Sequence, residues 1–213
     1  MTSSSLDLWA VMSTASTVRR YRPEPVDDAV VEKCLQAATW APSGANQQPW
    51  RFVVLRSAQA RAVISEGARR TWDAMADFYG LEIPKDRAAD TKSRVLRAMW
   101  EHTQVGGDAP VCVLFCVRPQ PGTGDLQQGG SIFPAVQNFL LAARAQGLGA
   151  AITLWHDSCE DELRALVGIP DDWRIATLIT AGWPKGAHHR VRRKPIDDVV
   201  AVDAWTRRWV GRP

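Results

Sequence analysis

A short stretch of small and amide residues joins a helix-like segment to a strand-like one and could bind a ligand. Residues 39–52 read TWAPSGANQQPWRF, and Pro42 ends the helical pattern before the turn. Gly44 gives the backbone freedom to turn, while Asn46 and Gln48 each offer a hydrogen-bond donor and an acceptor. Such a loop suits a flat ligand rich in hydrogen-bonding groups. An ordinary helix-to-strand connection would use similar residues, so the loop by itself leaves both interpretations open.

Two groups of basic residues lie near the two ends of the chain and could bind a phosphate. Residues 17–22 read TVRRYR, and residues 192–195 read RRKP. The planar guanidinium group of arginine matches a phosphate with two parallel hydrogen bonds. Each group by itself is more often a solvated basic turn. If the fold brought the two groups together, they would form one anion site.

Other kinds of chemistry find little support in the sequence. The four histidines show no metal-ligand spacing, and His156 and the pair 188–189 are expected at the surface. Residues 147–149 (Gly-Leu-Gly) follow a helix rather than a strand and lack the third glycine of a dinucleotide-binding fingerprint. The chain contains no Gly-x-Ser-x-Gly elbow, P-loop or HExxH helix, so hydrolase and kinase functions are not favoured.

The bulk composition indicates a globular protein. A chain of 213 residues with 46% hydrophobic and 23% charged residues can bury a substantial core in one domain. The net charge of +3 is small and spread along the chain, which argues against nucleic-acid binding. No signal peptide is recognised and no apolar run reaches the ~20 residues of a membrane span, so a cytoplasmic location is expected.

The four cysteines are expected to be reduced and buried. Cys112 and Cys116 are four apart on one expected strand and should face the same way. The cysteines are too scattered for a disulfide framework and show no paired zinc spacing. Reduced core thiols agree with a cytoplasmic protein.

Hydrophobic periodicity divides the chain into alternating helices and strands. Helices are expected at 5–17, 28–40, 58–79, 86–103, 133–146 and 159–167, and strands at 51–56, 110–117, 150–155 and 174–181. Residues 110–117 are apolar on both faces, which indicates a central strand, whereas the Gly-, Pro- and Gln-rich residues 118–131 indicate a loop. Trp205 and Trp209, in the mixed tail 195–213, are spaced as on a helical turn. Strands separated by helices predict a layered α/β or α+β domain.

In this order, the motifs resemble those of the nitroreductase family, the FMN-dependent NAD(P)H oxidoreductases. The resemblance rests on the basic segment with its two prolines, the loop with the helix before it, the central helix ending in Gly-Leu-Gly, and the closing Ala-Gly-Trp-Pro with the second basic group. These segments are 17–25, 37–52, 137–149 and 181–195. They are spread over nearly the whole chain. Together they are specific for the family, whereas any one of them alone would not be.

The resemblance implies one domain over residues 1–213 with a layered α+β fold, in which helices flank a central mixed β-sheet. It also implies an interlocked homodimer with one FMN at each of two interface sites, and a tail at 195–213 that packs on the partner. The implied FMN-binding residues are Ser16, Thr17, Arg19, Arg20, Pro42, Ser43, Gly44, Asn46, Gln48, Thr153, Leu154, Arg192 and Arg193.

Within this set the resemblance assigns different residues to different parts of FMN. Arg19 and Arg193 would hold the phosphate, with help from Thr17 and from Arg20 or Arg192. The loop from Pro42 to Asn46 would come from the other subunit and line the flavin. The pair 153–154, in the strand after Gly149, would lie against the ring.

One departure from the family concerns the phosphate. Many members carry arginine or a second basic residue just before the Ser or Thr of the first motif. Ala15 and Ser16 occupy these places here. One phosphate contact would therefore be missing or replaced by a hydroxyl.

The implied activity is the reduction of nitroaromatics, quinones or similar small planar acceptors by NAD(P)H, with ping-pong kinetics. FMN would carry the hydride chemistry, so no catalytic side chain and no metal is expected. One alternative is a flavoenzyme of the same fold that dehydrogenates, dehalogenates or uses a deazaflavin. Another is a relative without enzyme activity that sequesters flavin.

Overall fold

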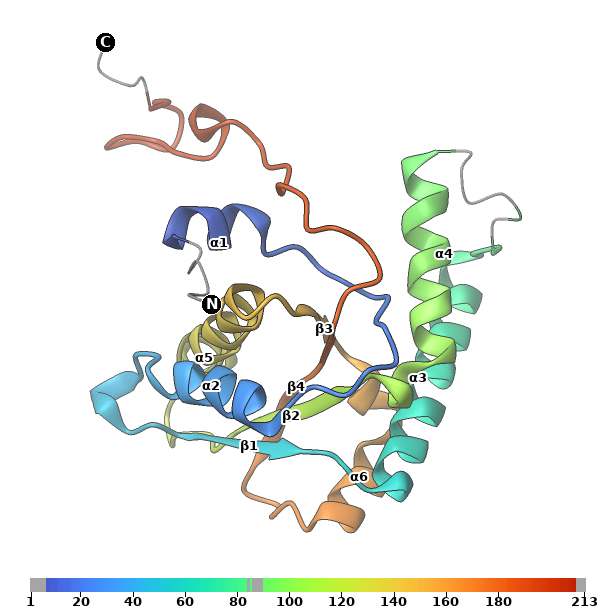
Figure 1. The fold of residues 1–213 in the computed structure, drawn as a ribbon. Coiled ribbons are helices and arrows are strands. Elements are labelled where there is room, and N and C mark those ends of the chain that lie inside the picture. The colour runs from blue at the N-terminus through green and yellow to red at the C-terminus, as the bar shows by residue number, and fades with distance from the viewer. Residues whose placement is uncertain (1–6, 84, 86–89, 210–213) are drawn as a thin grey trace.

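Helices and strands alternate along the chain, as the hydrophobic periodicity predicts. The computed structural model describes residues 7–83, 85 and 90–209. The described helices are α1 (Leu8–Thr14), α2 (Asp28–Thr39), α3 (Ala58–Tyr79), α4 (Thr91–Gln104), α5 (Asp125–Ala145) and α6 (Glu160–Val167). The strands are β1 (Trp50–Val54), β2 (Val111–Val117), β3 (Gly149–Thr153) and β4 (Arg174–Gly182). Short 3-10 helices are η1 (Gly44–Asn46), η2 (Gly106–Asp108), η3 (Trp155–Cys159) and η4 (Ile196–Asp198). Figure 1 shows the resulting layered α+β arrangement.

The helix ends lie where local chemistry favours them. The Asp27 side chain accepts a hydrogen bond from the Ala29 N–H at the start of α2, and Ser57 does the same for Ala60 at the start of α3. Both satisfy a backbone donor that the first helical turn leaves free. Gly80, with φ of 59°, ends α3 in the left-handed conformation that glycine adopts at little cost.

The four strands form one antiparallel sheet in the order β1–β2–β4–β3. The prediction of a mixed sheet is therefore wrong, because all pairings between the described strands are antiparallel. A parallel bridge joins Thr17, which lies outside the strands, to Ala150 of β3. The connections explain the difference. The helix pair α3–α4 returns the chain to the end of β1 that it left, so β2 runs antiparallel to β1. The single helix α5 makes β3 run in the direction of β2, but β4 lies between them.

Strand β2 lies between two hydrophobic cores, and every one of its residues is buried. Its side chains alternate between the two faces. Val113 and Phe115 face the core under α2 and α5, whereas Leu114 faces the core under α3 and α6. Cys112 and Cys116 share this second core, which confirms that they face the same way. All four cysteines are buried and free, and burial raises the pKa of each thiol to about 11.

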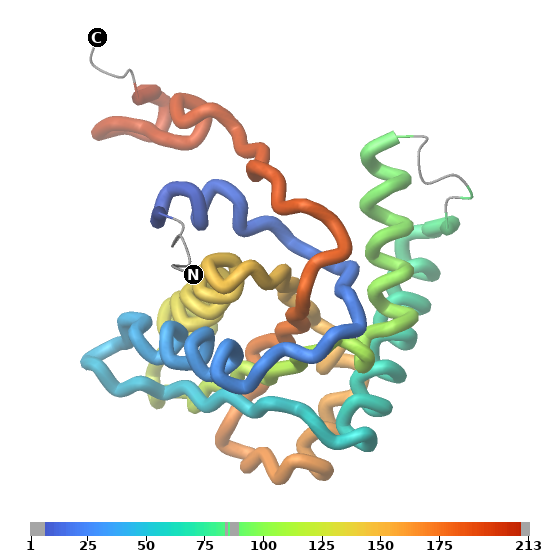
Figure 2. Tube along the Cα trace, viewed as in Figure 1, coloured from blue at the N-terminus to red at the C-terminus, as the bar shows by residue number. Residues whose placement is uncertain are grey.

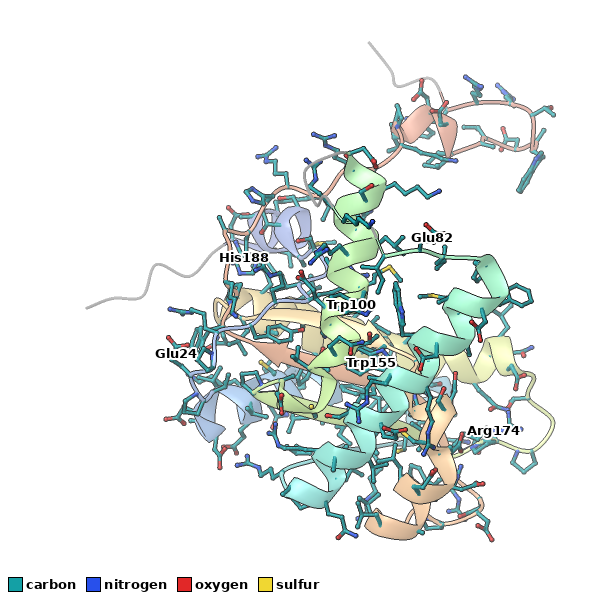
Figure 3. The ribbon with its side chains drawn as sticks, turned by 90° about the vertical axis from the view of Figure 1, so that its right-hand side faces the viewer. Glu24, Glu82, Trp100, Trp155, Arg174 and His188 are labelled. Atoms are coloured by element: carbon teal, nitrogen blue, oxygen red, sulfur yellow. The ribbon has the colours of Figure 1, made fainter. Side chains whose placement is uncertain are left out.

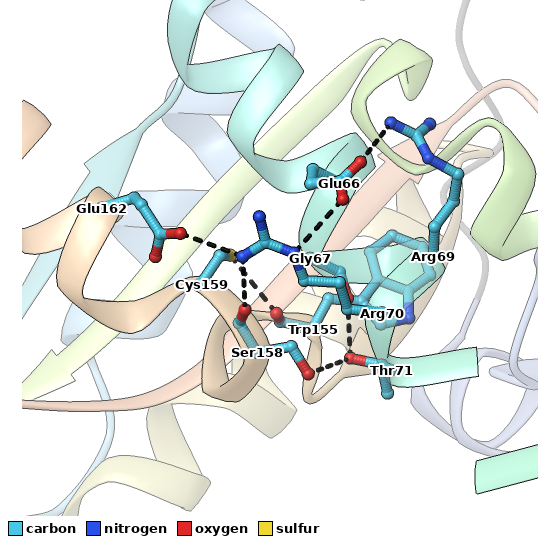
Figure 4. A network of polar contacts seen from close by, with 9 residues as sticks. All are labelled: Glu66, Gly67, Arg69, Arg70, Thr71, Trp155, Ser158, Cys159 and Glu162. Carbon is cyan, nitrogen blue, oxygen red and sulfur yellow. Dashed lines mark hydrogen bonds and ion pairs between the residues drawn. The ribbon is translucent and has the colours of Figure 1, made fainter. Parts of the chain in front are cut away.

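Close contacts fix α3 against η3, the turn that directly follows β3. A Cβ on Gly67 would collide with the Cys159 sulfur, so only glycine allows this approach. Beside it, Arg70 donates to the Ser158 carbonyl at 3.3 Å and to the Glu162 carboxylate at 2.9 Å (Figure 4). The contacts between α3 and η3 therefore fix the position of the end of β3.

Helix α5 begins earlier than the sequence predicts. Residues 118–131 were expected to form a loop, yet the helix starts at Asp125. An acidic residue in the first turn suits the helix dipole. Pro134 lies inside the helix, and its ring meets the carbonyl four residues before it. That residue is Gly130, whose backbone can adjust more freely than that of other residues.

The chain termini also differ from expectation. Helix α1 ends at Thr14 rather than near residue 17, and α4 begins at Thr91, while residues 5–6 and 86–89 lie outside the described part. Trp205 and Trp209 do not share a helical turn, because an antiparallel bridge joins Ala201 to Arg208. Trp205 lies in the connecting turn, 97% exposed.

Two further observations concern the described residues as a whole. No helix in this part of the chain combines the length and apolar character needed to cross a membrane. The same residues contain no cluster of three or more His, Cys, Asp or Glu side chains that could hold a metal ion. His156, expected at the surface, is buried because η3 turns it inward, and its Nε2 lies 3.1 Å from the Asp157 carboxylate.

Candidate functional site

The N-terminal basic segment lies in an extended conformation between the sheet and the C-terminal basic segment. On one side the Val18 N–H donates to the Ala150 carbonyl at 3.0 Å, next to the edge strand β3. On the other side, Arg22 N–H donates to the Trp183 carbonyl at 2.7 Å and Lys185 N–H donates to the Arg20 carbonyl at 3.0 Å. Figure 2 shows the two ends of the chain, in blue and orange-red, running side by side here.

The second basic group follows the same path. The Val191 N–H donates to the Ser13 carbonyl at 2.8 Å, so residues 192–195 begin beside the end of α1. The segments that carry the two arginine groups, about 170 residues apart in sequence, thus run alongside each other, with residues 20–22 beside 183–185 and residue 13 beside 191. Sequence alone could not establish this convergence, because it depends on the pairing of both ends with β3 and β4.

Two glycines allow the N-terminal segment to lie this close to the sheet. Gly149 of β3 and Gly182 of β4 are paired across the sheet. A Cβ on Gly149 would come within 2.5 Å of the Val18 side chain, and one on Gly182 would lie 3.1 Å from the Tyr21 Cβ. Side chains at either position would push the segment outward. Gly149 and Gly182 therefore position the candidate site.

A small hollow lies beside this segment. Its volume is about 90 Å³, whereas one water needs roughly 10–15 Å³, so it has room for a group of several atoms. Ser16 and Thr17, two of the expected FMN-binding residues, line it. The other lining residues are Ala15, Gln137, Leu140, Arg144, Leu148, Ala150, Ile152 and His188.

A larger pocket lies on the other side of the same segment. It has a volume of about 510 Å³ and is lined by Arg19, Arg20, Trp100, Gln104 and Lys185, among others. Trp100 belongs to α4, the outer helix of the α3–α4 pair (Figure 3). Arg19 thus lines a different pocket from Thr17, although the two are only two residues apart. Its assignment to the phosphate stays a prediction.

A buried polar network supports the wall between the N-terminal segment and α4. The Tyr21 hydroxyl lies 3.0 Å from Thr180 Oγ1 and donates to the Val18 carbonyl at 2.6 Å. His102 Nε2 lies 3.0 Å from the same Thr180 hydroxyl. Burial, with a smaller contribution from nearby Arg19, lowers the pKa of His102 to about 3. Burial also raises the pKa of Tyr21, so both groups stay neutral near pH 7.

The edge strand β3 presents apolar side chains toward the side on which the hollow lies. Ile152 is 46% exposed and Leu154 is 57% exposed, whereas Thr153 between them is buried. The Thr153 hydroxyl donates to the Leu178 carbonyl at 3.1 Å, so its side chain serves the sheet. Of the expected pair, Leu154 has a side chain that is available to a ligand. Thr153 could meet a ligand only through its backbone, because its side chain is buried. Ile152 was not predicted, although strand alternation places it on the face of Leu154.

The loop after α2 is organised by its own hydrogen bonds. Ser43 Oγ accepts from the Gln48 N–H at 2.9 Å, and the Gln48 amide donates to the Asn46 side-chain oxygen at 3.2 Å. Positive φ angles occur at Ala45, Asn46 and Gln48 (50°, 55° and 52°), not at Gly44. The expected turning role of Gly44 is therefore wrong in this respect. Non-glycine residues in this conformation are uncommon, and such strain occurs preferentially at functional sites.

Within one chain, this loop lies far from the arginines. It precedes β1, one edge of the sheet, whereas the N-terminal segment borders β3, the other edge. It also lies at the opposite end, since Trp50 pairs with Val117 at the end of β2 while Ala181 pairs with Val111 at its start. Figure 1 shows the loop between α2 and β1 at the far left. The expected residues thus form two groups, which one chain does not bring together.

Some residues that line the hollow were not predicted from the sequence. Arg144, Gln137 and Leu140 all lie on α5. Their three- to four-residue spacing places them on one helix face, which could have indicated a shared surface. His188 gave no such signal, because its place depends on the path of the C-terminal segment beside Gly147.

The structure thus defines an α+β protein in which an N-terminal basic segment lies between the edge strand β3 and the C-terminal segment. Comparison with known proteins identifies its family. Residues 13–183 match the nitroreductase family, and the chain belongs to it. The match begins at the end of α1 and ends after β4, and so includes the N-terminal segment, the loop before β1 and strand β3, but not residues 185–193.

Several characterised relatives share most of the chain. A 5,6-dimethylbenzimidazole synthase from Rhodospirillum rubrum is 30% identical over 180 residues, covering 80% of this chain and 79% of the relative. An NADH dehydrogenase from Thermus thermophilus is 26% identical, covering 86% and 90%. An iodotyrosine deiodinase from Rattus norvegicus is 27% identical, covering 93% and 70%. The relatives thus catalyse different reactions.

Solved structures have the same fold. A putative nitroreductase in complex with FMN from Desulfovibrio desulfuricans has a TM-score of 0.66 and 22% identity, covering 94% of this chain and 98% of that one. An iodotyrosine deiodinase bound to FMN and 3-iodo-L-tyrosine has a TM-score of 0.72 and 22% identity, covering 93% and 100%. These similarities confirm the nitroreductase-like layered α+β fold.

Proposed function

We propose that this protein is an FMN-dependent oxidoreductase that uses NAD(P)H to reduce nitroaromatics, quinones or similar small planar acceptors. The observation that carries the proposal is that the N-terminal basic segment lies along the edge strand β3 and is hydrogen-bonded to the C-terminal segment that leads to Arg192 and Arg193, in a chain of the nitroreductase family. The NADH dehydrogenase relative supports a nicotinamide donor. The synthase and deiodinase relatives catalyse other reactions, so the acceptor is proposed from the family resemblance rather than from these relatives.

The residues of the site fit FMN. Ser16 and Thr17 line the hollow and would offer their hydroxyls to a phosphate. Arg193 follows Val191, whose N–H donates to the Ser13 carbonyl three residues before Ser16. The exposed side chains of Ile152 and Leu154 offer an apolar surface to a flat ring. A buried nitrogen of His188 in the hollow has no hydrogen-bond partner among the described residues, as expected for a group that meets a ligand.

The chain's own residues would bind and orient rather than react. When bound, FMN would supply the hydride chemistry. Arg19, whose pKa burial lowers and which forms no ion pair with the described carboxylates, would attract negative charge at the polar edge of the ring. The Tyr21–Thr180–His102 network would hold the segment that carries Arg19 in place. Donor and acceptor would bind in turn at the same place, which gives ping-pong kinetics.

We also propose that the complete site needs a homodimer. The strained loop with Ser43 and Asn46 lies at the sheet edge opposite the arginines, so a second copy would have to supply it. Exposed apolar side chains on α1, among them Leu8, Trp9 and Met12, offer a surface for the partner. The tail at 195–213, with the nearly fully exposed Trp205, would pack on that partner.

The proposal is tested by a flavin spectrum followed by kinetics. Purified protein should be yellow or should gain absorbance near 450 nm when FMN is added, and it should then oxidise NAD(P)H with a nitroaromatic or quinone. Parallel lines in double-reciprocal plots would support the ping-pong order. Protein that stays colourless in excess FMN would overturn the proposal.

A second candidate function is reductive dehalogenation of an aromatic acid. The deiodinase relative favours it, and the larger pocket combines the Trp100 indole with the cations Arg19 and Lys185, which suit an aromatic ring and a carboxylate. Iodide release from iodotyrosine, measured against nitroaromatic reduction by the same reduced protein, separates the two. Flavin that binds but is hardly reduced by NAD(P)H would instead indicate a flavin-sequestering protein.

A further inference from the structure

The hollow beside Ser16 and Thr17 contains a basic side chain that the N-terminal segment does not supply. Arg144 of α5 lines it together with His188. The neighbouring positions Ala15 and Ser16 carry no charge, although many nitroreductases have basic residues there. A cation therefore reaches this hollow from a different element of the fold.

Arg144 is held in place yet has no anionic partner. Its Nε donates to Thr14 Oγ1 at 2.9 Å, which fixes the guanidinium beside the end of α1. Among the described residues no carboxylate forms an ion pair with it, and burial lowers its pKa. A partly buried guanidinium without a counter-ion is costly, and an anion in the hollow would remove this cost with charge-assisted hydrogen bonds.

His188 also lines the hollow. Its Nε2 lies 3.4 Å from the Gly147 carbonyl, which can only accept a hydrogen bond, and its buried Nδ1 has no hydrogen-bond partner in the described chain. Buried polar atoms are normally hydrogen-bonded, and in the neutral ring this Nδ1 is an acceptor. The unpaired guanidinium indicates a missing anion, and an anion in the hollow would favour protonation of Nδ1, which then becomes a second donor.

We infer that Arg144 and His188 form an anion site with Ser16 and Thr17 that binds the phosphate of FMN in place of the basic residues absent at positions 15 and 16. The inference rests on the proposed flavin function. It assigns the phosphate specificity of the site to α5 and to the C-terminal segment. Arg19, which lines the larger pocket, is then free to act at the ring.

The test compares FMN with riboflavin, which has the same ring and no phosphate. Binding of each flavin to the apoprotein is measured by quenching of flavin fluorescence. Arg144→Gln should weaken FMN binding by about ten- to a hundredfold, as expected for the loss of a charge-assisted hydrogen bond. Riboflavin binding should change by less than about twofold, because its contacts lie elsewhere. His188→Ala should give a smaller loss, again for FMN only.

Further arms keep the test independent of folding defects. Arg56→Gln removes an exposed arginine that pairs with Asp28, far from the hollow, and should leave both affinities unchanged. Ser16→Arg combined with Arg144→Gln should restore FMN binding by returning a cation to the N-terminal segment. Inorganic phosphate should compete with FMN, but not with riboflavin, in the wild-type protein, and this competition should disappear in Arg144→Gln.

The outcomes separate this inference from the function on which it rests. Equal losses for both flavins, or unchanged FMN binding in Arg144→Gln, would overturn the role of Arg144 while leaving a flavoprotein. Wild-type protein that binds neither flavin would overturn both proposals.

Discussion

At the scale of single residues, the basic side chains near the site differ in what holds them. Arg20 lies 3.8 Å from the Glu101 carboxylate and Arg22 lies 3.8 Å from Glu24, so each is partly neutralised. By contrast, Arg193 has a hydrogen bond only to the neighbouring Arg192 carbonyl among the described contacts. Counting arginines in the sequence could not separate these cases, because the acids come from α4 and from the turn before α2.

Arg193 should therefore contribute directly to flavin retention. Arg193→Ala is expected to weaken FMN binding by about 1.5–3 kcal/mol, the value of a hydrogen bond to a charged group. Equilibrium dialysis of FMN against the apoprotein measures the change. Arg174→Ala, which removes an exposed arginine paired with Asp125, serves as the control. Equal FMN affinity in Arg193→Ala and the wild type would show that the phosphate lies elsewhere.

His102 should make the fold sensitive to acid. Its pKa is lowered from 6.5 to about 3 by burial, so below pH 6.5 the unfolded chain binds a proton that the folded chain does not. The contribution of neutral His102 to the free energy of unfolding is fully present above the pKa of the unfolded state, and it is lost as the pH falls toward 3. Between pH 7 and pH 5 the wild type should lose about 2 kcal/mol more than His102→Gln. His156 and His188, whose pKa values burial also lowers, add to the slope in both proteins.

Urea unfolding at several pH values measures this difference. The two proteins are compared by how their free energies of unfolding change with pH, so a constant loss of stability in His102→Gln does not affect the result. Parallel pH profiles would show that burial does not hold His102 neutral in the folded protein.

At the scale of elements, the sequence predicted those parts of the fold whose signals are local. Helix α3 runs over the expected residues 58–79, because Ser57 and Gly80 mark its ends. The central strand was recognised from an apolar run that is buried on both faces. The start of α5 was missed, because Gly129, Gly130 and Pro134 are typical of loops and are tolerated there only in a packed helix. The burial of His156 depended on η3, which leaves no periodic pattern.

The site was predictable to a similar degree. Ser16 and Thr17 lie in the hollow as the motif implies, whereas Arg144 and Ile152 come from elements that the motif does not contain. The buried side chain of Thr153 follows from its pairing with β4, which a single strand cannot reveal. Chemistry near one motif can thus be inferred from sequence, but the contributions of other elements require the fold.

The contact of the N-terminal segment with Gly149 links an element's position to binding. Gly149→Ala would bring a Cβ within 2.5 Å of Val18, so the segment carrying Thr17 and Arg19 must move. We expect a loss of about 1–3 kcal/mol in stability from overpacking, together with weaker FMN binding. Thermal unfolding and FMN titration measure the two effects.

A matched glycine provides the control for this prediction. Gly130 lies inside α5, and a Cβ there would meet nothing within 4 Å. Gly130→Ala should leave FMN binding unchanged and raise stability by up to about 1 kcal/mol, the difference in helix propensity. If Gly149→Ala bound FMN as tightly as Gly130→Ala, the segment would not be positioned by this contact.

At the scale of the whole molecule, the separation of the two groups of site residues is the main consequence of the fold. The sheet places the arginines beyond β3 and the loop before β1, at opposite edges. No small motion of one chain could join them across the sheet. The proposed two-fold dimer would solve this, because the same interface would bring each subunit's loop to the other subunit's arginines and so complete two sites at once.

Subunit mixing tests this arrangement. One variant, Arg193→Ala, impairs the arginine half of the site, and another, Ser43→Ala with Asn46→Gly, impairs the loop half while keeping the positive φ at position 46 accessible. Each alone should retain little FMN. In a mixed dimer, one site combines the altered arginine half of one subunit with the altered loop half of the other. The second site then combines the two unaltered halves. After unfolding and refolding of an equal mixture, half the dimers are mixed, and about a quarter of all sites should bind FMN as tightly as the wild type. Refolding each variant alone is the control, and an absence of tight sites in the mixture would mean that each chain builds its site by itself.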